Sequence, residues 1–192
     1  MIYCYPNRID MFSQIPSGGI GAELGVAKGY NAINLLHQAK PSKLFLVDLW
    51  SSKQPPVSYL GGPQPLNVAE SVERKKIDNY SEFVSPLFSG NDEVEVCRVE
   101  ISSWLEKQPD DYLDWVYIDS AHDQESMTHQ IKRCLRVVKN GGIIAGHDFC
   151  VTPNMWGGGV IIPILETIQA GSLEMTGLTN EQFPSFMCKV KK

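Results

Sequence analysis

The sequence lacks several features that are typical of membrane proteins, of secreted proteins and of proteins stabilised by disulfides or zinc. No apolar run reaches about 18 residues, the length that a membrane-spanning helix needs, so no membrane association is expected. The first residues lack the charged-then-apolar pattern of a secretion signal. The 5 cysteines are odd in number and never occur in C-x-x-C spacing, which argues against a disulfide framework and a zinc site. Together these features predict reduced thiols in a cytoplasmic protein.

Positive charge is also scarce. The 17 Lys and Arg residues are outnumbered by 22 Asp and Glu residues, and the formal net charge is −5. A general nucleic-acid surface would be basic, so nucleic acid is not expected as a partner. The rest of the composition is ordinary: 192 residues, of which 43% are hydrophobic and 20% charged, are enough for one domain with its own core.

The most informative stretch of the sequence runs from Ile20 to Trp50. A short apolar run ends at Gly25, apolar residues then recur at helical spacing between positions 32 and 39, and Pro41 stops that helix. A second buried-strand pattern follows and ends at Asp48. This order of strand, helix and strand predicts a parallel sheet with a crevice at the carboxyl ends of its strands.

The loop after the first of these strands has the pattern E-x-G-x-x-x-G, formed by Glu23, Gly25 and Gly29. Glycine permits a sharp turn and close approach of a ligand, and the helix start offers N–H groups to an anion. Asp48 is placed to accept hydrogen bonds from ribose hydroxyls. The G-x-G-x-x-G spacing of NAD sites and the G-x-x-x-x-G-K-[ST] string of nucleoside triphosphatases are both absent. The unit therefore predicts an adenosine-bearing ligand with a small anionic group, although an ordinary crossover with structural glycines would have the same pattern.

The whole chain predicts about seven strands with helices on both faces of a mostly parallel sheet, which is the doubly wound α/β class. The later strands are expected at 93–99, 113–118, 143–145, 173–176 and 186–190, and a lead-in helix is expected around 7–14. A proline-rich loop and a largely helical segment separate the second and third strands. We expect residues 51–80 to form a lid insertion within a single domain that covers residues 1–192.

Polar side chains that can bind a metal or move a proton follow two of the later strands. Asp119 and His122 come after the strand at 113–118, and His147 and Asp148 come after the next strand. Neighbouring strands lie about 4.8 Å apart, so Asp119, His147 and Asp148 can bind one divalent cation such as Mg²⁺ or Mn²⁺. His122 suits a general base, because histidine titrates near neutral pH. Structural hydrogen bonds would account for the same four residues without a metal.

Two parts of the sequence resemble one known family. ELGVAKG followed by VDLW is similar to the first two motifs of class I S-adenosylmethionine-dependent methyltransferases. The string DWVYIDSAHDQESMTHQIKRCLRVVKNGGIIAGHDF resembles, more narrowly, their branch of small-molecule O-methyltransferases, which act on sugars and phenols, and of cephalosporin-hydroxylase-like proteins. The resemblance runs from about Gly19 to Phe149 and implies a Rossmann-like methyltransferase fold with S-adenosylmethionine as cofactor.

The resemblance also implies roles for individual residues. The glycine loop would hold the methionine part of the cofactor, and Asp48 would hold the ribose. Further cofactor contacts are expected from residues beside the strand ends and the helix start, with Glu100 near adenine: Glu23, Gly25, Gly29, Tyr30, Asn31, Trp50, Glu100 and Asp119. A core position is an equal alternative for Trp50, and simple surface exposure is one for Glu100. Related metal-dependent enzymes carry a carboxylate at the position of Asp119 and acidic groups at those of His147 and Asp148. The histidine here departs from that pattern and leaves the metal open.

The expected reaction is methyl transfer from S-adenosylmethionine to a hydroxyl of a small-molecule acceptor, with His122 and Asp119 as catalytic residues. A cation on Asp119 and Asp148 would favour the deprotonated acceptor. Trp156, in a glycine-rich loop, can contact that acceptor, although a surface loop anchored by the tryptophan would explain the same residue. Two alternatives stay open: a cofactor-binding protein of the same fold that does not methylate, and a nicotinamide-dependent enzyme. The sequence also leaves a homo-oligomer open.

Overall fold

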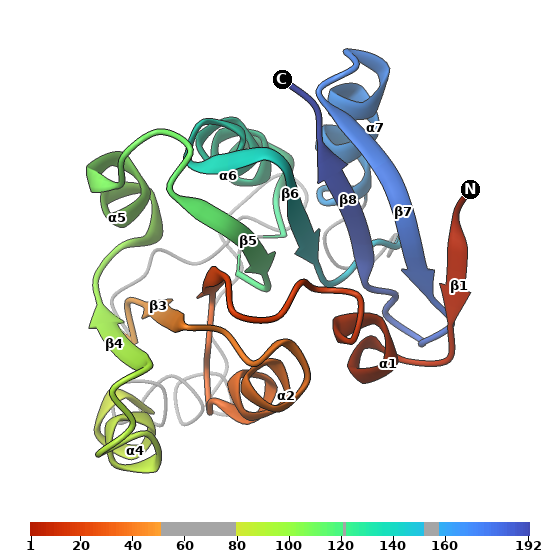
Figure 1. Ribbon diagram of the computed structural model, residues 1–192. Helices are drawn as coiled ribbons and strands as arrows, with labels where there is room; N and C mark the ends of the chain where they lie inside the picture. Colours follow the sequence, from red (N-terminus) through yellow and green to blue (C-terminus); the bar gives the residue numbers. More distant parts are fainter. Residues whose placement is uncertain (51–79, 121, 152–157) are drawn as a thin grey trace, which may run out of the picture.

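The computed structural model describes residues 1–50, 80–120, 122–151 and 158–192. They form an eight-stranded sheet in the order β1-β7-β8-β6-β5-β2-β3-β4, with helices on both faces (Figure 1). The strands are β1 (Tyr3–Tyr5), β2 (Ile20–Leu24), β3 (Lys43–Asp48), β4 (Val94–Arg98), β5 (Leu113–Ile118), β6 (Val138–Gly146), β7 (Leu173–Thr179) and β8 (Phe186–Val190). The helices are α1 (Arg8–Phe12), α2 (Tyr30–Ala39), α4 (Tyr80–Leu87), α5 (Ile101–Lys107), α6 (Gln124–Val137) and α7 (Ile161–Gln169). The expected doubly wound α/β class is confirmed.

The sheet has one strand more than the sequence predicted. β1 pairs in parallel with β7, and the Asn180 N–H donates to the Tyr5 carbonyl oxygen at 2.8 Å. Periodicity could not reveal this strand, because it has only 3 residues and most of its side chains are exposed. β8 runs antiparallel to β6 and β7, while the other pairings are parallel. The mostly parallel sheet is therefore as expected, with β1 added at one edge.

β6 begins earlier than expected. The strand was expected at 143–145, but β6 starts at Val138 and includes the run Asn140-Gly141-Gly142. The pairing of β5 with β6 shifts register between Leu113 and Trp115, so the extra residues are taken up as a bulge. A Cβ at Gly142 would lie 2.6 Å from the carbonyl oxygen of Asp114, which explains the glycine there. The glycines thus allow close strand contact, and the helix before them ends at Val137.

Alternate residues of the central strands face opposite layers of helices. On β5, Trp115 and Tyr117 belong to the hydrophobic cluster that includes residues of α1, α2 and α4. Val116 and Ile118 belong to the cluster that includes residues of α5, α6 and α7. This alternation follows from the two-residue period of a strand, and both faces of β5 are buried as a doubly wound fold requires.

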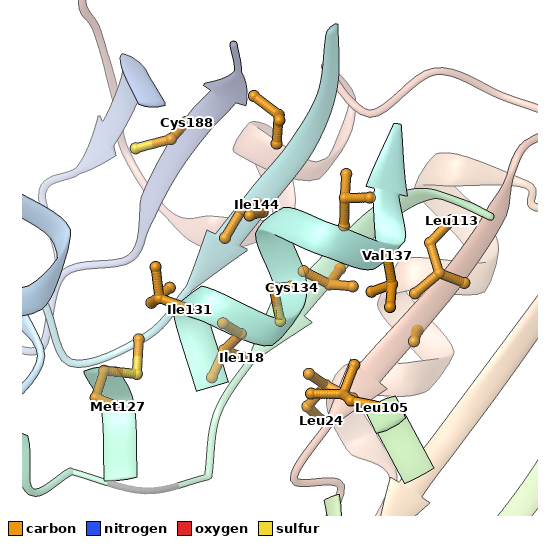
Figure 2. Packing of buried hydrophobic residues seen from close by; sticks show 14 of the residues in the cluster. Leu24, Leu105, Leu113, Ile118, Met127, Ile131, Cys134, Val137, Ile144 and Cys188 are labelled. Atoms are coloured by element: carbon orange, nitrogen blue, oxygen red, sulfur yellow. The ribbon is translucent and has the colours of Figure 1, made fainter. Parts of the chain in front are cut away.

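The packing of α6 fixes where β5 and β6 end. Figure 2 shows Ile131, Cys134 and Val137 of α6 beside Ile118 of β5 and Ile144 of β6. All five side chains are at most 2% exposed. Burial of each aliphatic side chain contributes roughly 1.5–3 kcal/mol, so this layer holds the two strand ends firmly in place.

Two expected functional segments fall outside the described residues. They are the lid insertion, apart from Tyr80 at the start of α4, and Trp156. Within the described ranges, no helix combines the length and the apolar character that crossing a membrane requires.

Candidate active site

The glycine loop connects β2 to α2, and its two glycines differ in what requires them. Gly25 has a φ of 91°, and a Cβ there would lie 2.1 Å from the carbonyl oxygen of Asp119. Gly29 has a φ of 78° at the N-cap of α2, where a Cβ would meet nothing closer than 3.4 Å. Lack of space therefore requires glycine at 25, whereas only the backbone angle favours it at 29. The expected contact of both with a cofactor stays a prediction.

Asp48, the residue expected to hold a ribose, ends β3 beside this loop. Its Oδ2 accepts hydrogen bonds from the Val26 and Ala27 N–H groups at 2.8 and 3.0 Å. Its Oδ1 accepts one from the Trp50 N–H at 2.9 Å. A carboxylate has about four lone-pair sites, so these bonds leave room for one further donor. In this structure Asp48 holds the loop in shape, and its role toward a ribose stays a prediction.

Trp50 lies elsewhere than expected for a residue that contacts the nucleoside. Its side chain is fully buried, and its indole Nε1 donates to the Ala27 carbonyl oxygen at 2.9 Å. A large aromatic side chain that follows a buried strand is stabilised most when it packs into the hydrophobic core. Trp50 therefore supports the glycine loop from within the core and presents no face to a ligand in this structure.

Glu23, near the end of β2, and Asn31, near the start of α2, form a polar pair that flanks the glycine loop. Asn31 Nδ2 donates to Glu23 Oε1 at 2.9 Å, and Glu23 is only 1% exposed. Glu23 Oε2 and Asn31 Oδ1 are buried and have no hydrogen-bond partner within the described ranges. Desolvation raises the pKa of Glu23 well above its ordinary value, Asp119 and Asp48 act in the same direction, and the Asn31 hydrogen bond opposes them. Unpaired buried acceptors are costly, so a ligand with an ammonium group would satisfy an existing need.

Tyr30 and Glu100 are the expected cofactor contacts at more exposed positions. Tyr30, the first residue of α2, is 65% exposed. Glu100 is the N-cap of α5, and its carboxylate accepts from the Ser102 and Ser103 N–H groups at 2.8 and 2.6 Å. Desolvation acts to raise the pKa of Glu100, but these hydrogen bonds outweigh it and lower the pKa. Glu100 thus has a helix-capping role, and its contact with adenine stays a prediction.

The second group of expected residues comes together at the ends of β5 and β6, which are paired neighbours. His122 Nε2 lies 2.6 Å from Asp148 Oδ2. His147 Nδ1 lies 3.3 Å from the same oxygen and 3.6 Å from Asp119 Oδ1. Desolvation acts to raise the pKa of Asp148, but hydrogen bonds to both histidines hold it well below its ordinary value. Asp148 is therefore an ionised carboxylate between two imidazole rings.

Arg8 belongs to the same cluster, and the sequence analysis did not identify it. Its Nη2 lies 2.5 Å from His147 Nε2, its Nη1 lies 3.9 Å from Asp119 Oδ2, and its Nε lies 3.4 Å from Glu181 Oε1. Arg8 begins α1, which packs against α2 and β7 (Figure 1). The sequence shows an arginine at the start of a short lead-in helix, but not which strand ends that helix will reach.

Two influences on His147 oppose each other. Desolvation lowers the pKa of His147, but hydrogen bonds and charges from Asp119 and Asp148 outweigh it and raise the pKa to about 9, which favours the charged ring. The contact with Arg8 favours the neutral ring, because a guanidinium can only donate and a charged imidazole cannot accept. The Arg8 contact decides the state of the ring, because two donors 2.5 Å apart would repel each other.

The residues that could hold a metal differ from the expected set. Among the described residues, Asp119, His122 and Asp148 offer ligand atoms that lie within 4.8 Å of one another. His147, expected in place of His122, has its Nε2 against Arg8. Carboxylates with an imidazole suit Mn²⁺ chemically, but His122 and Asp148 are held at hydrogen-bond distance. As folded, the donor set does not fit a metal, and we derive no step through one.

Comparison with known proteins adds a family to this geometry. A sequence model of the family described as "Methyltransferase domain" matches residues 22–149, which include the glycine loop and the ends of β5 and β6. No curated protein sequence matches the chain.

Solved structures share the fold. An rRNA methylase, provisionally so described, from Clostridium thermocellum has a TM-score of 0.61 at 12% identity, with 96% of this chain and 94% of that chain covered. The 1,6-didemethyltoxoflavin N1-methyltransferase of Burkholderia thailandensis has a TM-score of 0.60 at 12% identity, covering 97% and 80%. Aeropyrum pernix fibrillarin, with bound S-adenosylmethionine, has a TM-score of 0.59 at 11% identity, covering 90% and 67%. At these identities the likeness concerns the fold alone.

Proposed function

The chain belongs to the methyltransferase domain family, and on this premise we propose that it transfers a methyl group from S-adenosylmethionine to a hydroxyl group of a small molecule. The observation that carries the choice of cofactor is the pair of buried oxygens on Glu23 and Asn31, which flank the glycine loop and have no hydrogen-bond partner among the described residues. The net charge of −5 favours a small acceptor over an RNA, although one structural neighbour is described as an rRNA methylase.

The loop supplies groups for each part of the cofactor. Glu23 Oε2 and Asn31 Oδ1 are acceptors, and the ammonium group of the methionine part carries three donors. An ammonium placed there would satisfy both oxygens and offset the desolvation of Glu23. The N–H groups at the start of α2, which have no side-chain cap, suit the carboxylate of the same part. The remaining lone-pair site of Asp48 would accept from a ribose hydroxyl.

The cluster at the ends of β5 and β6 supplies the base. The cofactor, when bound, offers an electrophilic methyl group on a positively charged sulfur, so the chain has to align the acceptor oxygen and remove its proton. His122 Nε2 donates to Asp148, so the lone pair of the neutral ring is on Nδ1. His122 Nδ1 takes the hydroxyl proton as the oxygen gains the methyl group. Asp148 orients the ring and stabilises its charged form.

Ligand binding tests the choice of cofactor. S-adenosylhomocysteine at 100 times its Kd should stabilise the protein by about 2.7 kcal/mol, and NAD should not stabilise it. Stabilisation by NAD, with no response to S-adenosylhomocysteine, would favour a nicotinamide-dependent enzyme instead.

Methyl transfer needs a second experiment. S-adenosylmethionine with a labelled methyl group, incubated with a set of small hydroxyl compounds, should yield a labelled product. His122→Gln should lower kcat by roughly 10²- to 10⁴-fold and leave the affinity for S-adenosylhomocysteine unchanged. Tight cofactor binding with no product from any hydroxyl compound would favour a binding protein without transferase activity.

A further inference from the structure

We propose that Arg8 keeps the cluster at the ends of β5 and β6 as a metal-free hydrogen-bond network, so that methyl transfer by this chain needs no divalent cation. The second half of this inference rests on the proposed function, whereas the first half concerns the free protein alone. Arg8 is a positioning residue: its contacts are with His147, Asp119 and Glu181, which surround the base.

The position of Arg8 makes it a fixed cation inside the cluster. Its side chain is 25% exposed, and its guanidinium reaches His147, Asp119 and Glu181. These partners come from the ends of β5 and β6 and from the segment between β7 and β8. A guanidinium stays charged throughout the physiological pH range, so the positive charge beside Asp119 is permanent.

The first consequence concerns His147. Because Arg8 can only donate, His147 Nε2 has to accept, and the ring proton is then on Nδ1. A protonated Nδ1 has no lone pair for a metal, and it can donate toward Asp148 Oδ2 at 3.3 Å. Arg8 thus prevents His147 from acting as a metal ligand. His147 occupies the position at which metal-dependent relatives are expected to have an acidic group.

The second consequence concerns His122. Two ligands of one ion with metal–ligand bonds of about 2.1 Å lie about 3.0 Å apart when their bonds are perpendicular. His122 Nε2 and Asp148 Oδ2 are 2.6 Å apart, which is a hydrogen-bond distance. Both histidines therefore present N–H groups to Asp148, so the nitrogen of each ring that faces Asp148 has no lone pair for an ion shared with that carboxylate.

Asp119 and Asp148 are then the remaining ligands. Asp148 Oδ2 already faces both histidines, and the charge of Asp119 is already offset. Its Oδ2 faces the Arg8 guanidinium at 3.9 Å, and its Oδ1 faces His147. A cation entering the cluster would have to displace Arg8, move the His147 proton to Nε2 and break the bond between His122 and Asp148. The guanidinium charge does for Asp119 what a metal ion would otherwise do.

Mn²⁺ alone is the probe for this proposal, in the full chain without cofactor or acceptor. We expect the wild type to bind no Mn²⁺ at 100 μM in electron paramagnetic resonance titrations, a concentration on the order of a weak site's Kd. Arg8→Gln should gain one Mn²⁺ site whose Kd is at least about tenfold below that concentration. His147→Ala in the Arg8→Gln background should abolish this gain. Arg133→Gln, which breaks an exposed pair with Glu106, is the matched control and should bind like the wild type. Arg8→Lys keeps a donor-only cation and should also bind like the wild type.

A spectroscopic measurement on the wild type does not depend on the folding of any variant. Long-range ¹H–¹⁵N correlation should show His147 as the neutral ring with its proton on Nδ1. Three results would each overturn the proposal. They are a His147 ring with its proton on Nε2, a wild type that binds one Mn²⁺ at 100 μM, and a folded Arg8→Gln variant with no gain in Mn²⁺ affinity. Failure to bind S-adenosylhomocysteine would overturn the proposed function and leave these results on Arg8 intact.

Discussion

The two ends of the site are assembled in different ways. The end assigned to the cofactor comes from one continuous stretch, β2 to β3, and its shape depends on backbone groups held by Asp48 and Trp50. The end assigned to the acceptor joins α1, the ends of β5 and β6, and Glu181 through contacts between side chains. The first is held by hydrogen bonds between residues at most 23 positions apart in the chain. The second depends on the packing of distant elements.

Because of this difference, mutations at the two ends should have different effects. A change at the cofactor end has to disturb the backbone, and we therefore expect large losses of stability or cofactor affinity there. A change at the acceptor end alters contacts between side chains, so its effect should appear in proton transfer, metal affinity or acceptor choice, with the fold retained.

The largest effect is expected at Gly25, where the two ends touch. Gly25→Ala places a Cβ 2.1 Å from the Asp119 carbonyl oxygen at a φ of 91°. Left-handed backbone strain of 1–2 kcal/mol and a similar overpacking term give a loss of about 3 kcal/mol in the free energy of unfolding, measurable by urea denaturation. Gly171→Ala is the control, because its φ is 82° but its Cβ would have open space. It should cost about 1 kcal/mol, and equal losses at the two positions would show that the contact with Asp119 is unimportant.

The next effect concerns cofactor affinity. Glu23→Gln keeps the shape of the buried side chain but removes its charge, and a hydrogen bond to a charged group contributes about 1.5–3 kcal/mol. The Kd for S-adenosylhomocysteine, measured by calorimetry, should therefore rise roughly 10- to 100-fold. Glu181→Gln, at the acceptor end, should leave that Kd within about twofold of the wild type. A comparable loss in both variants would break the proposed division of the site.

The same carboxyl group should make stability depend on pH. Desolvation raises the pKa of Glu23 above its ordinary value of 4.5. Between these two pKa values the unfolded chain releases a proton that the folded chain retains, so stability falls as pH rises. Wild type and Glu23→Gln should thus be about equally pH-dependent below 4.5, and the wild type should lose stability relative to the variant above it. Saturating S-adenosylhomocysteine should narrow the gap, because its ammonium stabilises the ionised form. A constant gap in thermal unfolding across this pH range would contradict the raised pKa.

The sequence predicted the cofactor end more fully than the acceptor end for a physical reason. Glu23, Gly25 and Asp48 belong to one local pattern, because a strand, a tight turn and a helix leave a periodic signal in adjacent residues. The identity of the residues at the ends of β5 and β6 was also predictable, since strand ends can be located. The sequence could not predict which of their atoms face each other. Arg8 lies 139 positions from His147, and only tertiary packing brings the two residues together.

Trp50 and Glu100 show a second limit. Both were expected to contact the cofactor because they follow strands, but Trp50 is fully buried beneath the loop and Glu100 caps α5. The position of a residue after a strand predicts where its backbone lies. Burial and local hydrogen bonds then determine the direction of its side chain. A large apolar side chain is drawn into the core, and a carboxylate before a helix is drawn to its free N–H groups.

The smallest effect is expected at Glu100, and it tests whether the carboxylate serves the helix or the cofactor. Glu100→Ala removes acceptors for the Ser102 and Ser103 N–H groups, which should lower the free energy of unfolding by about 1 kcal/mol. If capping is its only role, the Kd for S-adenosylhomocysteine stays unchanged. Glu100→Ser, which can still cap the helix but is too short to reach a base, should recover most of the stability. An affinity loss in both variants, with stability restored only by serine, would instead assign Glu100 to the adenine and extend the cofactor end as far as β4.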